Sequence, residues 1–483
     1  MWKKFVKKYF RRKSVATLID NAQSSKLKKT MGAFQVALLG IGCIIGAGIF
    51  VLTGAAASLH AGPSVSLSFA LSGVICICAG LCYAEFASMI PISGSSYTYT
   101  YVTLGELPAW IIGSVSATAY FLGAVSVATG WSSYLVSFLN DFGINLPLQF
   151  IYNAGHEIIL ENGKTTEAIF NVPAFAISII SAFILCHGMK TSSLINTFIV
   201  FIKMVVLFTF VVVGITKINT ENWMPFIPAN TGEFGQFGIS GIIAGASMVF
   251  LAYNGFDSIC TAAQETKNPQ RDLPIGIIGA IAVSTIVYVL VALVLTGLVH
   301  YSELNSPEPI AIAVDKIGIP WFSTFVKIGA IAGLTSVILI SEYAIVRMVY
   351  TITRDKLLPA ILGKIHAKYR TPHIATLIIG FLIGVISATC SLEKVVKLSS
   401  FFILFTLIMV CVSAVYLRYK KPQLKRNFKC PFMPWIPLIS IALCMQMIFS
   451  LPLYIIFHAI AYIVLVIVFY FIYGRHHSPL TSK

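Results

Sequence analysis

The chain has 483 residues and a formal net charge of +16; 57% of its residues are hydrophobic and only 11% are charged. A soluble domain carries about 25% charged residues, and so few charges cannot cover a surface in water. The composition therefore excludes a soluble globular enzyme, a disordered chain and a collagen-like fibre. It favours an all-α polytopic membrane protein, because membrane β-strands alternate in polarity and give much weaker apolar signals.

Residues 1–30 form a basic arm with ten Lys or Arg residues and one acid, Asp20. No apolar stretch of the length of a signal-peptide core precedes residue 31, so we expect no cleaved signal peptide. Such an arm suits either nucleic acid or a membrane surface. Aromatic residues, among them Trp2 and Tyr9, alternate with the lysines beside the first apolar stretch. This pattern favours an interfacial segment on anionic lipid and no nucleic acid.

Apolar stretches separated by Gly, Pro or charged residues follow along the rest of the chain. At about 20 residues per span they predict twelve transmembrane helices. The expected spans lie near residues 32–58, 64–89, 107–138, 171–189, 192–216, 238–263, 275–299, 320–350, 373–390, 395–417, 435–452 and 454–473.

The distribution of Lys and Arg predicts how these spans are oriented. With the N-terminus in the cytoplasm, 26 of the 34 basic residues fall on the cytoplasmic side, five on the other side and three within spans. Cytoplasmic loops are the ones enriched in Lys and Arg, so we expect a cell-membrane protein with both termini in the cytoplasm. The net charge is then explained by topology and requires no acidic ligand.

The connecting segments leave no room for catalysis outside the membrane. None exceeds roughly thirty residues, which is too short for a soluble domain. The chain has no GxxxxGK[ST], HExxH or GxSxG motif, and its ten cysteines form no C-x-x-C pair or metal-ligand spacing with the nine histidines. We therefore expect a non-enzyme without cofactor or metal, which leaves transport or signalling.

Two of the expected spans have sequences that are poorly suited to continuous helix. The first holds four glycines between Gly40 and Gly48, and the sixth contains the run from Phe250 to Asp257, with Asn254 and Gly255 at its centre. Each Gly costs a helix about 1 kcal/mol relative to Ala. Either segment alone is more typical of close helix packing.

Together the two segments point to a different structure. They lie five spans apart, as expected for two five-helix repeats of opposite orientation whose interrupted helices meet at the membrane midplane. Unwound backbone there leaves N–H groups that suit a carboxylate and C=O groups that suit an ammonium. An α-amino acid carries both groups, so the pair predicts an amino acid site.

The same residues resemble a known family. The chain is similar over nearly its whole length to bacterial cationic-amino-acid-transporter-like members of the amino acid–polyamine–organocation superfamily. The similar segments are Arg11 to Val15, Gly42 to Phe50, Tyr83 to Phe86, Gly130 to Ser132, Gly255 to Asp257, Asn268 to Gly276, Gly329 to Val337, Arg354 to Asp355, Leu357 to Pro359 and Pro431 to Pro437. The resemblance implies a leucine-transporter-like fold, with repeats over 31–217 and 218–430 and two further helices and a tail over 431–483.

The resemblance also implies a substrate site at the two breaks. The substrate carboxylate would meet the N–H groups of Ala47 and Gly48, beside Gly46. The ammonium would meet carbonyls at the end of the first half-helix and in the sixth-span break, namely those of Ile44, Leu251, Ala252 and Asn254.

A lysine in the middle of the fifth expected span predicts proton coupling. Lys203 lies several residues from either end of its span, where a snorkelling side chain is less expected, and charges inside membranes usually have a function. Burial disfavours the charged form of lysine, so Lys203 is expected to bind and release a proton. By resemblance it replaces a bound ion, contacts the broken first helix and approaches the hydroxyls of Thr335 and Ser336.

Three positions depart from the resembled pattern and bear on the substrate. Ala119 precedes Tyr120 where members that bind cationic substrates often carry an acid, Asn254 replaces an apolar residue, and Glu342 stands in the eighth span. These departures favour neutral or polar amino acids. Glu342 is expected either to pair with Arg347 or to compensate for the missing acid.

Several further side chains receive expected roles. Phe250 and Phe256 flank the second break and are candidates to close over a substrate. The intramembrane acids Glu85 and Asp257 are expected to brace helices. Lys327 and Arg347, nearer span ends, are expected to snorkel.

The leading expectation is proton-coupled amino acid symport by alternating access. An amino acid exchanger and a non-transporting amino acid sensor with the same pocket remain alternatives, and a membrane enzyme is the weakest. A small membrane subunit or a homo-oligomer stays open as a partner beside substrate, protons and lipid bilayer.

Overall fold

The structure is a computed structural model, and it describes residues 11–12, 31–90, 95–159, 165–187, 193–369 and 371–477. The basic arm therefore lies outside the described residues except for Arg11 and Arg12. The Arg12 guanidinium donates to the hydroxyl of Tyr416 at 2.6 Å and lies 5.0 Å from the centre of its ring.

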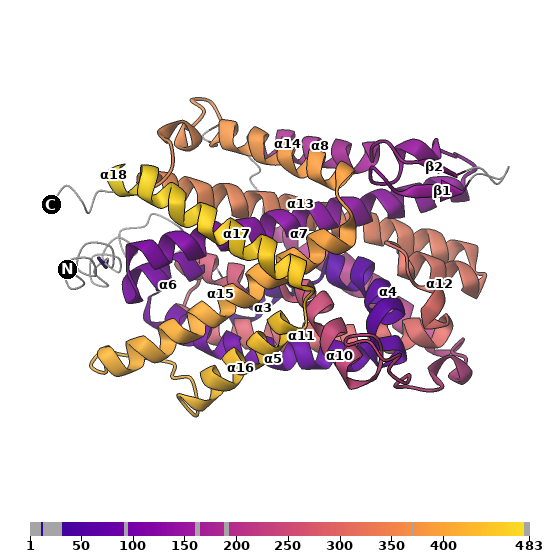
Figure 1. Ribbon diagram of the computed structural model, residues 1–483, viewed down its shortest axis with the longest axis horizontal. Coiled ribbons are helices and arrows are strands. Elements are labelled where there is room, and N and C mark those ends of the chain that lie inside the picture. The colour runs from indigo at the N-terminus through magenta and orange to yellow at the C-terminus, as the bar shows by residue number, and fades with distance from the viewer. Residues whose placement is uncertain are drawn as a thin grey trace.

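Long helices lying along one axis make up most of the molecule (Figure 1). In chain order the α-helices are α3 (Ala33–Ile44), α4 (Thr53–Ala56), α5 (Val65–Met89), α6 (Ser95–Thr103), α7 (Glu106–Asp141), α8 (Val172–Cys186), α9 (Ser193–Ile215), α10 (Gly238–Val249), α11 (Pro269–Leu298), α12 (Pro309–Ile317), α13 (Pro320–Arg354), α14 (His373–Thr389), α15 (Leu392–Lys420), α16 (Trp435–Phe449), α17 (Leu453–Phe469) and α18 (Arg475–His477). A short antiparallel hairpin, β1 (Glu157–Ile159) with β2 (Thr165–Glu167), was not expected from the sequence.

Seven helical stretches in the described chain are long and apolar enough to cross a membrane. They are Ala33–Met89, Glu106–Asp141, Gly238–Cys260, Pro269–Leu298, Pro320–Arg354, Leu392–Lys420 and Leu453–His477. Four shorter apolar helices accompany them: Val172–Cys186, Ile199–Ile215, His373–Thr389 and Trp435–Phe449. The protein is thus a multi-pass helical membrane protein, while the count of twelve spans and their inverted repeat remain predictions.

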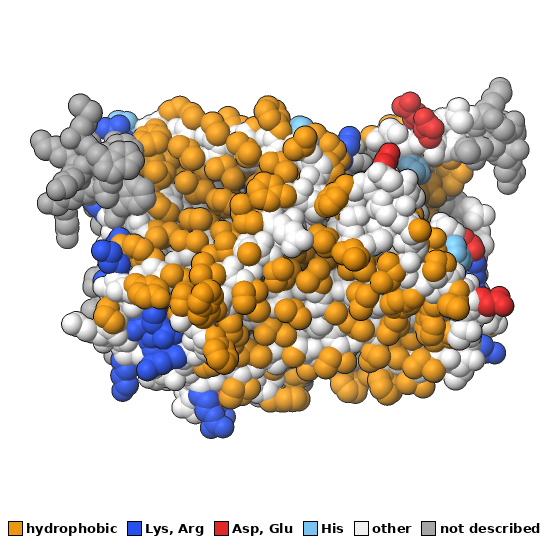
Figure 2. All heavy atoms as spheres, turned by 60° about the horizontal axis from the view of Figure 1, so that its bottom comes forward, with side chains coloured by type: hydrophobic (Ala, Val, Ile, Leu, Met, Phe, Trp, Pro, Cys, Tyr) orange, Lys and Arg blue, Asp and Glu red, His pale blue; other side chains and the backbone are white. Residues whose placement is uncertain are grey.

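Hydrophobic side chains cover most of the face seen in Figure 2, between two differently charged ends. Lys and Arg gather at the end where α18 lies, and Asp and Glu at the end where β1 and β2 lie (Figures 1 and 2). An apolar middle between polar ends is the surface that a lipid bilayer requires.

Two groups of helices surround the site. In the first group, α11 packs against both α3 and α5, and α10 packs against α5. In the second group, α13 packs along α7, and α14 packs against α8. Helix α9 contacts both groups, through α3 and α11 on one side and α13 on the other.

Both segments expected to be unsuited to helix are interrupted. Helix α3 ends at Ile44, Ile45 is extended, and a π-helical turn begins at Gly48. Helix α10 ends at Val249, and a 3-10 turn follows over Phe250–Tyr253. Gly255 then has φ +111°, a conformation that glycine adopts without a steric penalty.

Two intramembrane charges are held by distant partners. The Glu85 carboxylate is 2% exposed and accepts from the guanidinium of Arg418 at 2.6 Å and that of Arg426 at 3.0 Å, and from the Cys430 N–H at 2.8 Å. It braces α5 against α15 and the loop after α15, as expected for this residue.

The expectation that Lys327 snorkels is wrong. Its side chain is 1% exposed, and its ammonium contacts Asp141 at 2.8 Å and Asp315 at 3.0 Å. Asp315 comes from α12, which directly precedes α13 in the chain, whereas Asp141 comes from α7, far away in the sequence. Arg347, by contrast, is exposed and lies over the ring of Tyr343.

Candidate functional site

A cavity with an empty volume of about 460 Å³ lies between the two interrupted helices. It is lined by six of the seven residues expected to bind substrate: Ile44, Gly46, Ala47, Gly48, Leu251 and Asn254. The other lining residues are Cys43, Tyr120, Gly123, Val127, Gly255, Ser258, Val337, Ile340 and Ser341. The seventh expected residue, Ala252, lies behind Gly48: a Cβ atom on Gly48 would fall 2.0 Å from the Ala252 Cβ atom.

The first break places the start of a helical turn beside this cavity. Gly48 begins the helical turn after the break, and Ala47 immediately precedes it. The first N–H groups of a helix have no acceptor within the helix, so such a terminus favours an anion. These two residues therefore have the position and polarity to receive a carboxylate.

The carbonyls expected to bind an ammonium already have donors in three of four cases. The Tyr288 hydroxyl, from α11, lies 2.7 Å from the Ile44 oxygen and 3.0 Å from the Ala252 oxygen. The Leu251 oxygen accepts from the Asn254 N–H at 3.0 Å. Each carbonyl has two lone pairs and can accept a second bond.

Tyr288 is the partner of these carbonyls that sequence reasoning missed, although its own side chain is not among those that line either cavity. A tyrosine within an apolar stretch is ordinary in a membrane helix, and only its hydroxyl distinguishes it from the surrounding residues. The one signal in the sequence was a phenol in an otherwise aliphatic run, Ile286 to Val291, and this signal is weak.

Lys203 reaches the first break from α9. Its side chain is buried, and its ammonium donates to the Gly42 oxygen at 3.3 Å and the Ile45 oxygen at 3.2 Å. Its aliphatic stem lies against α13, where a Cβ atom on Gly333 would meet Lys203 Cγ at 3.3 Å. A buried ammonium thus binds the carbonyls left free where α3 ends.

The two hydroxyls expected beside Lys203 are bonded elsewhere. Thr335 donates to the Ile331 oxygen and accepts from the Trp131 indole, while Ser336 donates to the Gly333 oxygen. Within the described chain no hydrogen bond joins Lys203 to either residue. Lys203 contacts α13 at Gly333, whereas the hydroxyl groups of Thr335 and Ser336 each donate to a carbonyl of α13 itself.

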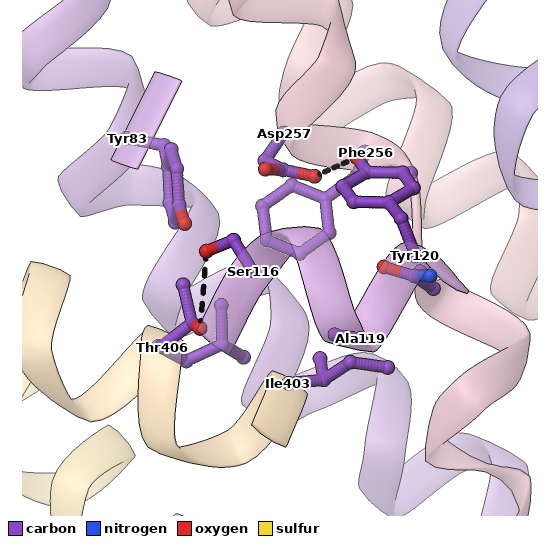
Figure 3. Close-up of a pocket in the computed structure, with 11 residues that line it drawn as sticks. Tyr83, Ser116, Ala119, Tyr120, Phe256, Asp257, Ile403 and Thr406 are labelled. Carbon is purple, nitrogen blue, oxygen red and sulfur yellow. Dashed lines mark hydrogen bonds between the residues drawn. The ribbon is translucent and has the colours of Figure 1, made fainter. Parts of the chain in front are cut away.

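A second cavity adjoins the first and shares Tyr120, Asn254 and Gly255 with it. Its empty volume is about 300 Å³, and Figure 3 shows its lining, with Asp257 on one side and Ala119 beside Ile403 on the other. The Asp257 carboxylate accepts from the hydroxyls of Tyr120 and Ser95, at 2.5 and 2.9 Å. These bonds brace the second break against α6 and α7.

Two of the expected specificity or gating residues line neither cavity. Phe250 is fully buried, whereas Phe256 lines the second cavity and meets Tyr83 edge to face at 5.3 Å. Glu342 is 1% exposed, and its carboxylate oxygens have no hydrogen-bond partner in the part of the chain that the structure describes. Arg347 donates to Tyr343 instead, so the expected Glu342–Arg347 pair is absent from the described residues.

The chain is similar in sequence to known membrane transporters. The chain is 39% identical over 473 residues to the methylthioribose transporter of Bacillus subtilis (strain 168), covering 98% of this chain and 99% of that protein. It is 39% identical over 475 residues to the branched-chain amino acid permease BcaP of the same organism, with the same coverage. It is 36% identical over 357 residues to cationic amino acid transporter 9, chloroplastic, of Arabidopsis thaliana, covering 73% of this chain and 60% of that protein.

These relatives are permeases and transporters, not enzymes. The family model described as amino acid permease matches residues 31–482, nearly the whole chain. The chain belongs to the amino acid permease family, within the amino acid–polyamine–organocation superfamily.

Proposed function

We propose that the protein is a secondary active amino acid transporter of the cell membrane that binds the substrate zwitterion between the two breaks. The proposal rests on the observation that residues of both breaks line the same cavity. The helix start at Gly48 would supply N–H groups for a carboxylate. Ile44, the last residue of α3, and Leu251, in the 3-10 turn after α10, would supply carbonyls for an ammonium. Alternating access then requires the helix groups around this site to move relative to each other.

The lining of the first cavity favours a neutral substrate. Val127, Leu251, Val337 and Ile340 contribute aliphatic walls, and no Asp, Glu, Lys or Arg lines this cavity among the described residues. A cationic side chain left without an anion there would pay its desolvation without compensation. The relative named as a branched-chain amino acid permease supports an aliphatic amino acid.

We further propose that proton binding at Lys203 drives uptake. The ammonium supplies charge-assisted hydrogen bonds to the Gly42 oxygen, on the last turn of α3, and to the Ile45 oxygen, in the break itself. A neutral amine would hold these carbonyls less firmly. Protonation and the geometry of the substrate site would therefore be coupled, and a proton gradient could be used to accumulate substrate.

The positions of the charges support the proposed orientation in the membrane. The loops gathered at the Lys- and Arg-rich end of the molecule would face the cytoplasm, together with both termini (Figure 2). The partners in this reading are an amino acid, protons and the lipid bilayer.

Uptake by the purified protein in proteoliposomes tests the function. Radiolabelled L-leucine, L-alanine and L-arginine are supplied outside, with the outer solution more acidic than the lumen. Proton symport predicts accumulation of a neutral amino acid that vanishes when an ionophore dissipates the gradient.

Other results would point to the alternatives. Uptake that ignores the gradient and requires amino acid inside the vesicles would replace symport by exchange. Binding without flux would indicate a sensor. Preferred uptake of L-arginine would overturn the neutral-substrate assignment.

A further inference from the structure

The Tyr288 side chain joins the two interrupted helices directly. Its hydroxyl lies within hydrogen-bond distance of the last carbonyl of α3, that of Ile44, and of the Ala252 carbonyl in the 3-10 turn after α10. The side chain is fully buried. Its ring packs against the rings of Phe69 and Tyr253, with centroids 5.2 and 5.4 Å away, so the phenol oxygen is held in place.

In this contact the number of hydrogen-bond donors does not match the number of acceptors. A phenol carries one proton, yet it faces two carbonyl oxygens, at 2.7 and 3.0 Å. Both carbonyls belong to residues where the regular helix has ended, and Ile44 and Ala252 were expected to bind a substrate ammonium. The hydroxyl therefore has one donor for two carbonyl acceptors.

We propose that the Tyr288 hydroxyl is an internal stand-in for the substrate ammonium. Between substrates it donates to the two carbonyls, which would otherwise be buried without a partner. When an amino acid enters, its ammonium brings three donors: two serve these carbonyls in place of the phenol, whose own proton turns away, and the third serves the carbonyl of Leu251 in the cavity lining. This inference rests on the proposed function, because it assigns a role within the same substrate site.

The proposal predicts the sign of a mutational effect. In Tyr288→Phe, the substrate-free protein loses the donor for two buried carbonyls, whereas in the complex the ammonium still serves both. The substitution thus destabilises the free state more than the bound state. We expect substrate to bind about two- to tenfold more tightly, the factor that one ordinary hydrogen bond is worth. A residue that simply contacted the substrate would give weaker binding.

A matched control is available on α7. The Tyr134 hydroxyl donates to the Phe50 oxygen at 2.7 Å, and its side chain is fully buried. This bond also ends on the first interrupted helix, but on Phe50, in the helical turn that follows the break. Tyr134→Phe should lower the melting temperature without changing the affinity for amino acids.

The experiment measures binding by isothermal titration to the detergent-purified full chain. L-leucine, L-alanine, L-methionine and L-arginine are tested on the wild type, and the tightest ligand is compared with its 2-hydroxy acid analogue, which has no ammonium. Tyr288→Phe should tighten binding of the amino acid but not of the 2-hydroxy acid. Its melting temperature without ligand should fall, and the rise on adding the amino acid should exceed that of the wild type.

Each other outcome has a distinct meaning. Weaker binding of the amino acid by Tyr288→Phe, or equal tightening for the 2-hydroxy acid, would overturn the stand-in role while leaving the proposed function intact. Failure of the wild type to bind any of the four amino acids would overturn the proposed function itself. If Tyr288→Phe cannot be purified alone, it is purified with saturating amino acid. Recovery with the amino acid but not with the 2-hydroxy acid supports the proposal, and recovery with neither overturns it.

Discussion

Gly48 and Ala252 meet where the two interrupted helices approach each other. A Cβ atom built on Gly48 would stand 2.0 Å from the Cβ atom of Ala252 and 2.2 Å from its Cα atom. No side chain can flex to relieve this collision, because one of the two atoms belongs to the backbone. The site therefore exists in its present form only with glycine at position 48.

Gly48→Ala is expected to abolish amino acid binding. The added methyl group must push the first break away from the second, which separates the N–H groups at one side of the cavity from the carbonyls at the other. Thermal stabilisation of the purified variant by amino acids measures this loss. Gly279→Ala on α11 is the control, since a Cβ atom there would meet nothing within 4 Å. Normal affinity in Gly48→Ala would contradict the proposed backbone site.

Lys203→Ala is expected to uncouple transport from the proton gradient. Without the ammonium, the Gly42 and Ile45 oxygens lose their donor, and no protonation event reaches the first break. Gradient-driven accumulation should vanish, while exchange of labelled for unlabelled amino acid across the vesicle membrane is retained in part. Lys217→Ala, at an exposed lysine just past α9, should accumulate substrate as the wild type does. Accumulation by Lys203→Ala on a proton gradient would disprove the coupling role.

Glu85→Gln is expected to destabilise the protein strongly without affecting substrate affinity. The substitution leaves the guanidinium groups of Arg418 and Arg426 without their anion, and the side chain of Arg426 is 3% exposed. Breaking a buried ion pair from one side costs about 3–5 kcal/mol. Thermal unfolding of the variant measures the effect. Glu303→Gln, which removes the partner of Lys316 from a pair whose two side chains are both exposed, should leave the melting temperature unchanged.

Lys327→Met is expected to loosen α12 from α7 and α13. The lysine is the buried member of its cluster, whereas the side chains of Asp141 and Asp315 are 32% and 46% exposed and can be solvated after the substitution. The loss should therefore be about 1.5–3 kcal/mol, the worth of hydrogen bonds to a charged group. Limited proteolysis around α12 and thermal unfolding report it. Lys316→Met removes the exposed pair with Glu303 and should give the wild-type pattern in both assays; the same pattern in Lys327→Met would contradict the expectation.

The stability of the protein is expected to depend on pH because of the buried carboxyl group of Glu308, in the loop before α12. Burial raises the pKa of its carboxyl above the usual value of 4.5, although Ser306, Ser133 and Lys327 partly oppose this shift. The folded protein therefore holds this proton more tightly than the unfolded chain, and stability falls as pH rises from the usual pKa towards the raised one. Glu308→Gln should melt at a higher temperature than the wild type near neutral pH and at the same temperature in acid. A difference that does not depend on pH would contradict this assignment.

The sequence alone was sufficient to predict the class of protein and the two interruptions in its helices. A composition so poor in charge has few alternatives to a helical membrane protein. The breaks could be predicted because four glycines within the run from Gly40 to Gly48, and Asn254 beside Gly255, disfavour the helix that contains them. Lys203 could be singled out for a similar reason, because a charge in the middle of an apolar span is energetically costly wherever its partners lie.

Partnerships between helices were decided only by the tertiary structure. Tyr288 lies 244 residues from Ile44, and Arg418 lies 333 residues from Glu85. Lys327 meets partners on α7 and α12, and Thr335 and Ser336 turn to their own helix instead of Lys203. The local sequence pattern indicates how a residue affects the stability of its own helix, because helix propensity and hydropathy act over a few turns. Which donor meets which acceptor depends on helix rotation and packing, and these are properties of the assembled bundle.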